Sequence, residues 1–307
     1  MFTKIIICDP ISKSGMELLS SAGFEVDAKF DLTPEKLKQM IVEYDAIIVR
    51  SRTMVTREII EAGKKLKAIG RAGVGLDNID VEAAKKRGVN VLNAPESLTA
   101  SVAELTIGLM ISVARQIPRA DQTMKDGKWI KKELTGTMLK GKTLGIIGFG
   151  RVGGAVASIA MAMGMNILVA DVSVNQKRVA EVDAKAVSIE KLLRESDFIT
   201  LHVPLTPNTR KMIGEKQLQM MKTGTYLVNT SRGAVIDEKA VLKALQGGKL
   251  AGAAFDVYDV EPPTDLSLVK MANVVCTPHI GAQTNEAQEL AGVIIAEKII
   301  NSLKRLK

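Results

Sequence analysis

The chain has 307 residues, enough for two domains or one large one. Hydrophobic residues make up 46% of it and charged residues 25%, an ordinary globular balance that excludes wholesale disorder. The net charge is +8, but only 3% of residues are aromatic and the basic residues are scattered among acids. This pattern argues against nucleic-acid binding, and a small anionic substrate explains the basic balance equally well.

Cys8 and Cys276 are too few for a disulfide framework and favour a reducing, cytoplasmic location. The apolar run at residues 5–8 is too short for the core of a signal peptide and predicts a first strand. Residues 152–170 carry no charge, but glycines interrupt them. We therefore predict a buried helix followed by a buried strand there, and no membrane span.

Short apolar strands alternate with amphipathic helices through the first third of the chain. Thr33 and Thr56 are candidate N-caps for two of these helices. Continuous apolar strands that alternate with helices are typical of a parallel sheet covered on both faces. The predicted strands span residues 4–9, 25–28, 46–50, 68–71 and 89–92, with helices near 12–22, 34–43, 56–62 and 80–87.

The alternation restarts after a long helix, predicted over residues 98–117, and a polar, lysine-rich stretch that runs to residue 142. The fold class is therefore α/β, with two doubly wound parallel-sheet domains over 1–96 plus 285–307 and over 97–284. The terminal helix, near 286–306, could return to either domain and is assigned to the first. The strands predicted for the second domain span residues 143–147, 166–170, 198–202, 226–229, 252–256 and 274–277.

A glycine motif follows the strand at 143–147 and opens a helical pattern, the context of a dinucleotide-binding turn. Gly148 permits the tight turn, Gly150 lets the backbone approach a pyrophosphate, and Gly153 allows close packing of helix on strand. Asp171 lies 18 residues after Gly153, where an acid binds the ribose hydroxyls and repels a 2′-phosphate. The motif predicts NAD in preference to NADP, and a turn without a ligand is the alternative.

Three reactive side chains each follow a predicted strand, at the sheet edge where ligands bind. His279 is one of only two histidines, with His202. Glu261 lies in a turn after another strand. If its carboxylate lies beside the imidazole of His279, it favours the protonated form of that ring. Arg232 offers a planar guanidinium to a carboxylate or carbonyl. Each has an ordinary explanation as a surface or loop residue, but three at three strand ends predict a catalytic group.

With these motifs the chain resembles the D-isomer-specific 2-hydroxyacid dehydrogenases over essentially its whole length. The resemblance implies a Rossmann NAD-binding domain, a flavodoxin-like substrate (lid) domain, and hydride transfer from a D-2-hydroxy acid to NAD. It is closest to the members that oxidise D-3-phosphoglycerate, the first step of serine biosynthesis. The matching segments are residues 144–153, 227–237, 253–263 and 278–288. Residues 49–53, 70–78 and 279–288 support the choice of the phosphoglycerate-oxidising members.

The resemblance also implies residue roles. Arg232 would bind the substrate, and His279 would be the general acid/base whose pKa Glu261 holds up. The domains would close over the substrate about hinges at 92–98 and 284–288. The implied cofactor-binding residues are Gly148, Gly150, Arg151, Val152, Gly153, Asp171, His202, Pro204, Thr230 and Asp256. The implied substrate-binding residues are Arg50, Ser51, Gly73, Val74, Gly75, Arg232, His279 and Gln288.

Two departures leave the exact hydroxy acid open: Leu98 stands where many phosphoglycerate-oxidising members carry asparagine, and Gln283 where a small serine is usual. A glyoxylate or hydroxypyruvate reductase or a D-lactate dehydrogenase is the alternative, against which the basic pair Arg50 and Arg52 argues. A binding protein or co-repressor that keeps this fold is a further alternative. No metal is predicted, because two histidines and two cysteines at distant positions give no clustered ligand set.

The resemblance alone implies a homodimer or higher homo-oligomer. We expect the apolar helix at 102–114 to form the contact surface, although a buried core helix would show the same pattern. Lys131 and Lys132 either reach the neighbour's active site or form a solvated basic loop. Because the chain ends at Lys307, we expect no appended regulatory domain.

Overall fold

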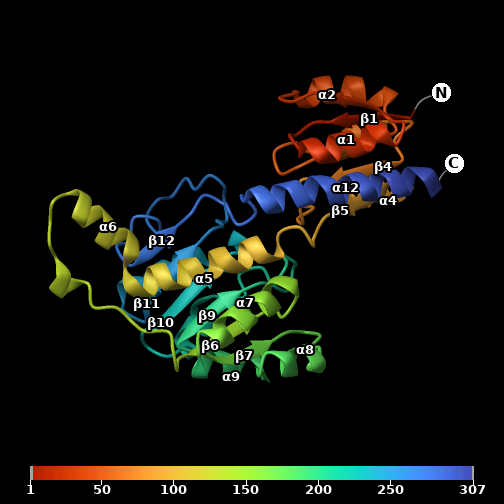
Figure 1. Cartoon of the computed structure of the whole chain (residues 1–307). Coiled ribbons are helices and arrows are strands. Elements are labelled where there is room, and N and C mark those ends of the chain that lie inside the picture. The colour runs from red at the N-terminus through yellow and green to blue at the C-terminus, as the bar shows by residue number, and fades with distance from the viewer. Residues whose placement is uncertain (1–2, 306–307) are drawn as a thin grey trace. The chain divides into compact units, whose positions relative to one another are not determined.

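The computed structural model describes residues 3–305, and the chain divides into two compact units. Met1–Leu98 with Ala282–Lys307 form the first unit, and Thr99–Gly281 form the second. These bounds differ from the predicted division by two residues at the first crossing and three at the second. Each unit has its own parallel sheet and its own core (Figure 1).

The first unit contains a five-stranded parallel sheet in the order β2-β1-β3-β4-β5. This is the flavodoxin-like order, as predicted. All four residues of β3 are buried, because helices cover both faces of the sheet. The strands are β1 (Lys4–Ile7), β2 (Glu25–Ala28), β3 (Ala46–Val49), β4 (Ala68–Arg71) and β5 (Asn90–Asn93).

Five helices cover this sheet. One face packs against α2 (Pro34–Met40), α3 (Arg57–Ala62) and α4 (Val81–Lys86), with a short 3₁₀ turn at Ile41–Glu43. The other face packs against α1 (Lys13–Ser21) and the terminal α12 (Asn285–Arg305). Thr33 caps α2 through the Lys36 N–H, whereas Thr56 occupies the N-cap of α3 without such a bond.

The terminal helix α12 packs within the first unit, in contact with α1 and β4. A Cβ at Gly15 of α1 would lie 2.6 Å from the carbonyl oxygen of Gly292 of α12, so the two backbones cross in direct contact. A Cβ at Gly70 of β4 would likewise lie 2.9 Å from Ile295. These close approaches, together with buried Ile295 and Ile299, fix α12 on this sheet. The predicted helix end at residue 306 lies outside the described residues.

The second unit contains a seven-stranded parallel sheet in the order β12-β11-β10-β9-β6-β7-β8. Strand order reverses between β6 and β9, which is the topology of the Rossmann fold. β8 (Lys185–Ala186) was not predicted, because it is a two-residue edge strand with both residues exposed. The other strands are β6 (Thr143–Ile147), β7 (Asn166–Ala170), β9 (Phe198–Leu201), β10 (Thr225–Asn229), β11 (Leu250–Phe255) and β12 (Val274–Cys276).

Two helices, α5 (Thr99–Arg115) and α7 (Arg151–Ala162), cover one face of this sheet. The expectation that residues 102–114 form a contact surface with a second copy is wrong for most of this helix. Ile107, Met110 and Val113 of α5 are buried against α7 and the sheet, so its apolar pattern belongs to the unit's own core. Other helices of this unit are α8 (Gln176–Glu181), α9 (Ile189–Glu195), α10 (Glu215–Met220) and α11 (Glu238–Gln246), with 3₁₀ turns at Lys131–Glu133 and Gly233–Val235.

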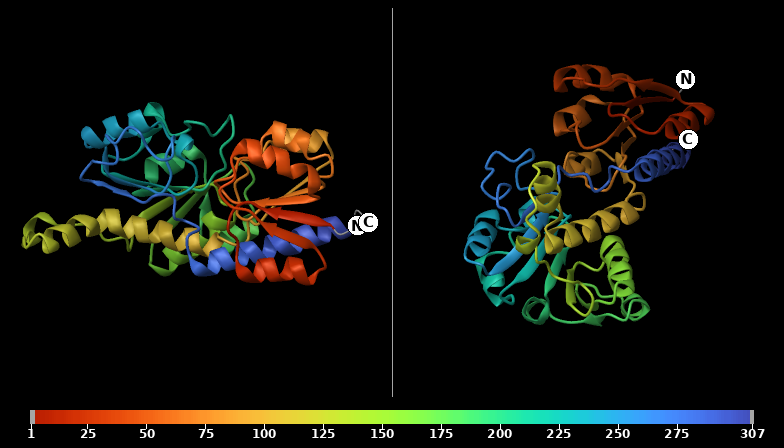
Figure 2. Two further views of the ribbon diagram at one scale, coloured as in Figure 1. Left: turned by 90° about the horizontal axis from the view of Figure 1, so that it is seen from above. Right: turned by 60° about the vertical axis from the view of Figure 1, so that its left-hand side comes forward.

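A helix that the sequence did not predict, α6 (Ile117–Lys125), follows α5 after Gln116 turns the backbone into the left-handed region at φ 53°. Figure 2 shows α6 and the chain after it extending away from the sheet of the second unit. No residue of α6 is buried. Large apolar side chains are exposed on and after it: Ile117, Met124, Trp129 and Met138.

The uncharged stretch at 152–170 forms α7 and β7, as predicted. Within residues 3–305, no single helix combines the length and apolar character needed to span a membrane. α5 and α6 meet that criterion only when taken together, and their axes are bent by 65° at the junction.

Candidate active site

The glycine turn between β6 and α7 is built as its sequence predicts. Gly148 has φ +94°, and a Cβ there would lie 2.5 Å from the carbonyl oxygen of His202. A Cβ at Gly153 would overlap the carbonyl oxygen of Gly148, so helix and turn pack too closely for any other residue. At Gly150, by contrast, a Cβ would meet nothing within 4 Å. The three glycines therefore serve the turn, the packing and an open approach to the backbone.

The N-terminus of α7 opens onto this turn, with Gly150 at the N-cap and Arg151 and Val152 in the first turn. Free N–H groups and the helix dipole favour an anion at this position. Asp171 follows β7, and its carboxylate accepts hydrogen bonds from the N–H groups of Phe149 (2.6 Å) and Ser173 (2.9 Å). The acid is thus fixed beside the glycine turn.

Arg178 of α8 also reaches the glycine turn, and the sequence reasoning missed it. Its Nη2 donates to the carbonyl oxygen of Gly150 at 3.0 Å, and its guanidinium lies 5.6 Å from the ring centroid of Phe149. The side chain comes from a short polar helix with no motif of its own, so only the fold brings it to the turn.

His202 lies across the strand-order reversal from the glycine turn, at the end of β9. Its Nε2 is 3.0 Å from the Thr200 hydroxyl. Burial lowers the pKa of His202 to about 3, so its ring is neutral at physiological pH. Pro204 is exposed two residues further on. Thr230, after β10, is buried with its hydroxyl 2.8 Å from that of Thr106 in α5.

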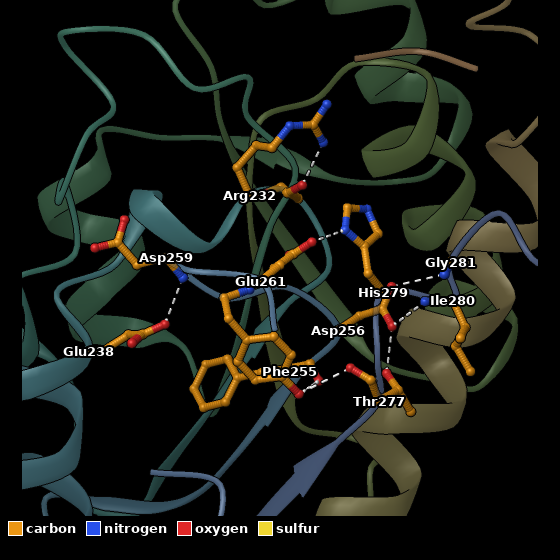
Figure 3. A network of polar contacts seen from close by, with 12 residues as sticks. Arg232, Glu238, Phe255, Asp256, Asp259, Glu261, Thr277, His279, Ile280 and Gly281 are labelled. Carbon is orange, nitrogen blue, oxygen red and sulfur yellow. Dashed lines mark hydrogen bonds and ion pairs between the residues drawn. The ribbon is translucent and has the colours of Figure 1, made fainter. Parts of the chain in front are cut away.

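Arg232, Glu261 and His279 follow three neighbouring strands, β10, β11 and β12, at one edge of the sheet. Figure 3 shows the three side chains close together. His279 Nδ1 lies 2.7 Å from Glu261 Oε2, and Glu261 Oε1 accepts the Tyr258 N–H at 3.1 Å. The structure therefore brings together all three residues that were predicted as the catalytic group.

The backbone at His279 is in the left-handed region, at φ 54°. Asp256, only 1% exposed, stabilises this conformation by accepting hydrogen bonds from the N–H groups of Ile280 and Gly281, each at 2.8 Å. The Thr277 hydroxyl also donates to Asp256, at 2.6 Å (Figure 3). Asp256, predicted as a cofactor ligand, thus has both carboxylate oxygens engaged by the histidine loop.

Arg232 is positioned by the turn after β10. The Asn229 side chain donates to the Arg232 carbonyl oxygen at 2.9 Å and accepts from the N–H and the hydroxyl of Ser231. Gly233 follows, and a Cβ there would overlap the peptide between Tyr258 and Asp259. The turn that carries Arg232 therefore packs backbone to backbone against the turn that carries Glu261.

Electrostatics distinguish the two histidines. The hydrogen bond with Glu261 raises the pKa of His279, against an opposing effect of burial. Burial alone would raise the pKa of Glu261, but hydrogen bonds from His279 and from the Tyr258 N–H outweigh it and lower that pKa. His279 is therefore the histidine whose protonated form is favoured, and its half-exposed ring can be reached by a substrate.

The first unit has its own cluster at the carboxyl ends of its strands. Arg50 follows β3, and its Nη1 donates to Oε1 of Gln288, in the first turn of α12, at 2.6 Å. Gln288 in turn donates to Gln283 and to the carbonyl oxygen of Ala282. Ser51 is exposed in the same loop. Arg50 and Gln288, both predicted to bind substrate, are therefore in direct contact.

That glycine loop comprises Gly73, Val74 and Gly75 and follows β4. The Asn93 side chain of β5 donates to the Val74 carbonyl oxygen at 2.7 Å, and the Ala94 N–H donates to that of Gly73 at 2.8 Å. A Cβ at Gly73 would lie 2.7 Å from the end of the Arg71 side chain, so that side chain would have to move. The loop is therefore held from the neighbouring strand.

Comparison with known proteins identifies the family. Residues 107–281 match the family model described as D-isomer specific 2-hydroxyacid dehydrogenase, NAD binding domain. The chain belongs to this family. It is 47% identical over 304 residues to a D-3-phosphoglycerate dehydrogenase of Archaeoglobus fulgidus, covering 99% of this chain and 58% of that protein. The chain thus spans little more than half the length of this relative.

Other members match the chain over its whole length. A hydroxypyruvate reductase of Thermotoga maritima is 47% identical, with 98% of each chain covered. Among solved structures, a D-lactate dehydrogenase of Aquifex aeolicus in complex with NAD and lactic acid is 30% identical, with a TM-score of 0.86 and coverage of 99% and 95%. The solved structure shares the fold of this chain over nearly its whole length.

The residues of the second unit fit the NAD of the family's binding domain. The open face at Gly150 leaves space for a pyrophosphate, the N-terminus of α7 offers N–H donors, and Asp171 stands where ribose hydroxyls would donate. Within the described range 3–305, no group of three or more His, Cys, Asp or Glu side chains is arranged to hold a metal ion.

Proposed function

We propose that this chain catalyses the NAD-dependent oxidation of D-3-phosphoglycerate to 3-phosphohydroxypyruvate by hydride transfer. The observation that carries the proposal is the His279–Glu261 pair, 2.7 Å apart, beside Arg232 on three neighbouring strands of an NAD-binding domain. The name of the Archaeoglobus relative supports the choice of substrate.

His279 acts as the proton carrier. Because Nδ1 faces Glu261, Nε2 is the ring nitrogen left for the substrate. The neutral ring takes the proton of the C2 hydroxyl as the C–H bond breaks, and in the reverse direction the imidazolium returns it. NAD, when bound, supplies the acceptor for the hydride that leaves C2. Glu261 stabilises the positive ring that forms on proton uptake.

Arg232 stabilises charge on the substrate. Its guanidinium is permanently charged and planar, so it suits a carboxylate and the oxygen on C2 that becomes polarised during the transfer. The packing of Gly233 on the Glu261 turn keeps this charge beside the proton carrier. Asp171 favours NAD over NADP, because a 2′-phosphate beside a carboxylate would be repelled.

In the first unit, Arg50, Ser51 and Gln288 are proposed to bind the phosphoryl group, and the N–H groups of the loop at 73–75 the carboxylate. Arg50 provides a cation whose partner is the neutral amide of Gln288. A phosphoryl dianion would gain charge-assisted hydrogen bonds there. An unphosphorylated acid would gain much less.

A second candidate is the reduction of hydroxypyruvate. The Thermotoga relative with that name matches this chain over 98% of both lengths, and the catalytic group would serve either substrate. Leu98 and Gln283, which depart from the pattern of phosphoglycerate-oxidising members, also leave it open.

The deciding experiment measures NADH consumption with phosphohydroxypyruvate, hydroxypyruvate, glyoxylate and pyruvate. We expect kcat/KM to be at least about tenfold higher for the phosphorylated acid, equivalent to about 1.4 kcal/mol of transition-state discrimination. Equal or better use of hydroxypyruvate or glyoxylate would reject the phosphoglycerate assignment and favour the second candidate.

A homodimer or higher homo-oligomer is proposed as well. Ile117 and Met124 on α6, a helix with no buried residue, and Trp129 and Met138 after it expose apolar surface that a second copy would cover. Trp129→Glu should give a smaller species in analytical ultracentrifugation with its circular dichroism unchanged. A wild-type chain that already sediments as a monomer would reject the proposal.

A cytoplasmic location is also proposed. Both cysteines are free thiols, and Cys8 is buried. A chain without disulfides is typical of a reducing compartment.

A further inference from the structure

The loop of residues 50–53, here named the arginine loop, follows β3 in the first unit. Strand order in this sheet reverses between β1 and β3, and ligands of open α/β sheets bind outside the carboxyl ends of the strands at that point. Asp9 follows β1 and therefore stands across the reversal from the arginine loop. It is 1% exposed, an unusual position for a carboxylate.

All the hydrogen bonds that Asp9 accepts in the structure come from the arginine loop. Its Oδ2 accepts the N–H of Arg50 at 2.6 Å and that of Thr53 at 3.2 Å. Its Oδ1 accepts the Thr53 hydroxyl at 2.8 Å and the Nε–H of Arg52 at 3.4 Å. Four donors satisfy the buried carboxylate, and the carboxylate in turn fixes those donors.

Asn78 binds the carbonyl groups of the same loop. It is 8% exposed, and its Nδ2 donates to the carbonyl oxygens of Arg50 (2.8 Å) and Thr53 (2.6 Å). Asp9 thus binds N–H groups at both ends of the loop, and Asn78 binds carbonyl groups at both ends. The loop backbone is fixed by two buried side chains.

The two arginines of the loop are used differently. Arg52 is engaged by acids, Asp9 and Asp31, the latter at 2.5 Å. Arg50 donates to the neutral Gln288, so its charge remains for an external anion. The geometry separates a structural arginine from one that can bind a ligand.

We infer that Asp9 and Asn78 are positioning residues that set the enzyme's selectivity for a phosphorylated substrate by fixing the arginine loop. This inference rests on the proposed function. Neither residue is proposed to touch the substrate. They act through the orientation of Arg50, so their loss lowers the advantage of a phosphoryl group more than it lowers turnover of an unphosphorylated acid.

The test is the selectivity ratio, defined as kcat/KM for phosphohydroxypyruvate divided by kcat/KM for hydroxypyruvate. We expect Asp9→Asn to lower the ratio about tenfold or more, through a higher KM for the phosphorylated acid, because the amide group turns a donor toward the loop's own donors. Hydroxypyruvate kinetics should change by less than about threefold.

Asp31→Asn is the matched control. It also removes one negative charge beside Arg52, but its side chain is exposed and makes no bond to the loop backbone. Asparagine also tolerates the left-handed conformation at this position, where φ is 58°. Its ratio should stay at the wild-type value. If both variants shifted the ratio equally, general electrostatics would explain the effect and the inference would be overturned.

Should Asp9→Asn fail to fold, Thr53→Val removes only one donor to Asp9, and Thr53→Ser restores it. The ratio should fall in the valine variant and recover in the serine variant. A wild-type ratio of about ten or more that survives these substitutions would overturn the inference alone. A wild-type ratio near one would overturn the proposed function together with it.

Discussion

Glu261 binds two different groups through its two oxygens, the Tyr258 N–H through Oε1 and His279 through Oε2. The carboxylate cannot rotate without losing one of them. The turn that carries Glu261 therefore orients His279. The Glu261 carboxylate both positions the imidazole ring and raises its pKa.

Glu261→Gln should move the pH profile of keto-acid reduction to lower pH. Reduction needs the imidazolium, and the raised pKa of His279 keeps that form present above the ordinary range for histidine. Without the carboxylate the pKa falls, so the rate at neutral pH falls with it. The measurement is kcat against pH for the variant and for Glu195→Gln, an exposed acid on α9. An unshifted profile in Glu261→Gln would contradict the role of the pair.

Arg232, Glu261 and His279 could be predicted as one group from the sequence, because each lies in the loop after a strand. Parallel strands bring their carboxyl ends together at one edge of the sheet. Asp9 follows a strand in the same way, and this signal could have found it. Arg178 and Asn78 could not be found so, because a hydrogen bond to a loop 25 or more residues away leaves no local pattern. The cofactor and substrate roles of the predicted residues remain predictions.

In the turn between β6 and α7, Gly150 and Gly153 are required for different reasons, cofactor access and close packing. Gly150→Ala should leave thermal stability within about 0.5 kcal/mol of wild type, because its Cβ enters open space. It should raise the Kd for NAD about tenfold, because that space is where the pyrophosphate approaches. Gly153→Ala should lower both stability and NAD affinity, since its Cβ overlaps Gly148. Calorimetry of unfolding and of NAD binding checks both variants. Equal effects would argue against this division.

A second pair of variants tests the contact between the turns after β10 and β11. Gly233→Ala should destabilise the chain by about 1–3 kcal/mol and lower kcat, because the added methyl group pushes the Glu261 turn away from Arg232. Gly108→Ala, in α5, meets no atom within 4 Å and should stabilise by about 0.5–1 kcal/mol through helix propensity. Denaturant unfolding and steady-state rates measure both. A Gly233→Ala enzyme with wild-type stability would show that the turns are not in firm contact.

Strands with buried residues were easier to predict than the short exposed strand β8 and the exposed helix α6. Residues 143–147 and 166–170 were predicted with the observed bounds, because nearly every residue in them is buried and apolar. β8 and α6 bury no residue, so no hydrophobic period marks them. β2 buries no residue either, yet its bounds were predicted, so burial alone does not decide which elements a sequence marks.

In the whole molecule, the apolar patterns of the two long helices, α5 and α12, do not by themselves show which surface covers each helix. The apolar positions of α5 fit either a core or an interface, and the structure assigns most of them to the core of the second unit. The apolar stripe of α12 fits either unit, and the glycine contact between Gly15 and Gly292 decides for the first. A hydrophobic pattern predicts that a face is covered, but the partner that covers it depends on contacts distant in sequence.

The most direct test of the account is the turnover of His279→Asn with phosphohydroxypyruvate and NADH. Asparagine tolerates the left-handed backbone that position 279 requires, so the loop should keep its shape. We predict that kcat falls by about 10²–10⁴ while the Kd for NADH and the thermal stability stay at wild-type values. Turnover close to wild type would contradict the assignment of His279 as the proton carrier, and with it the proposed mechanism.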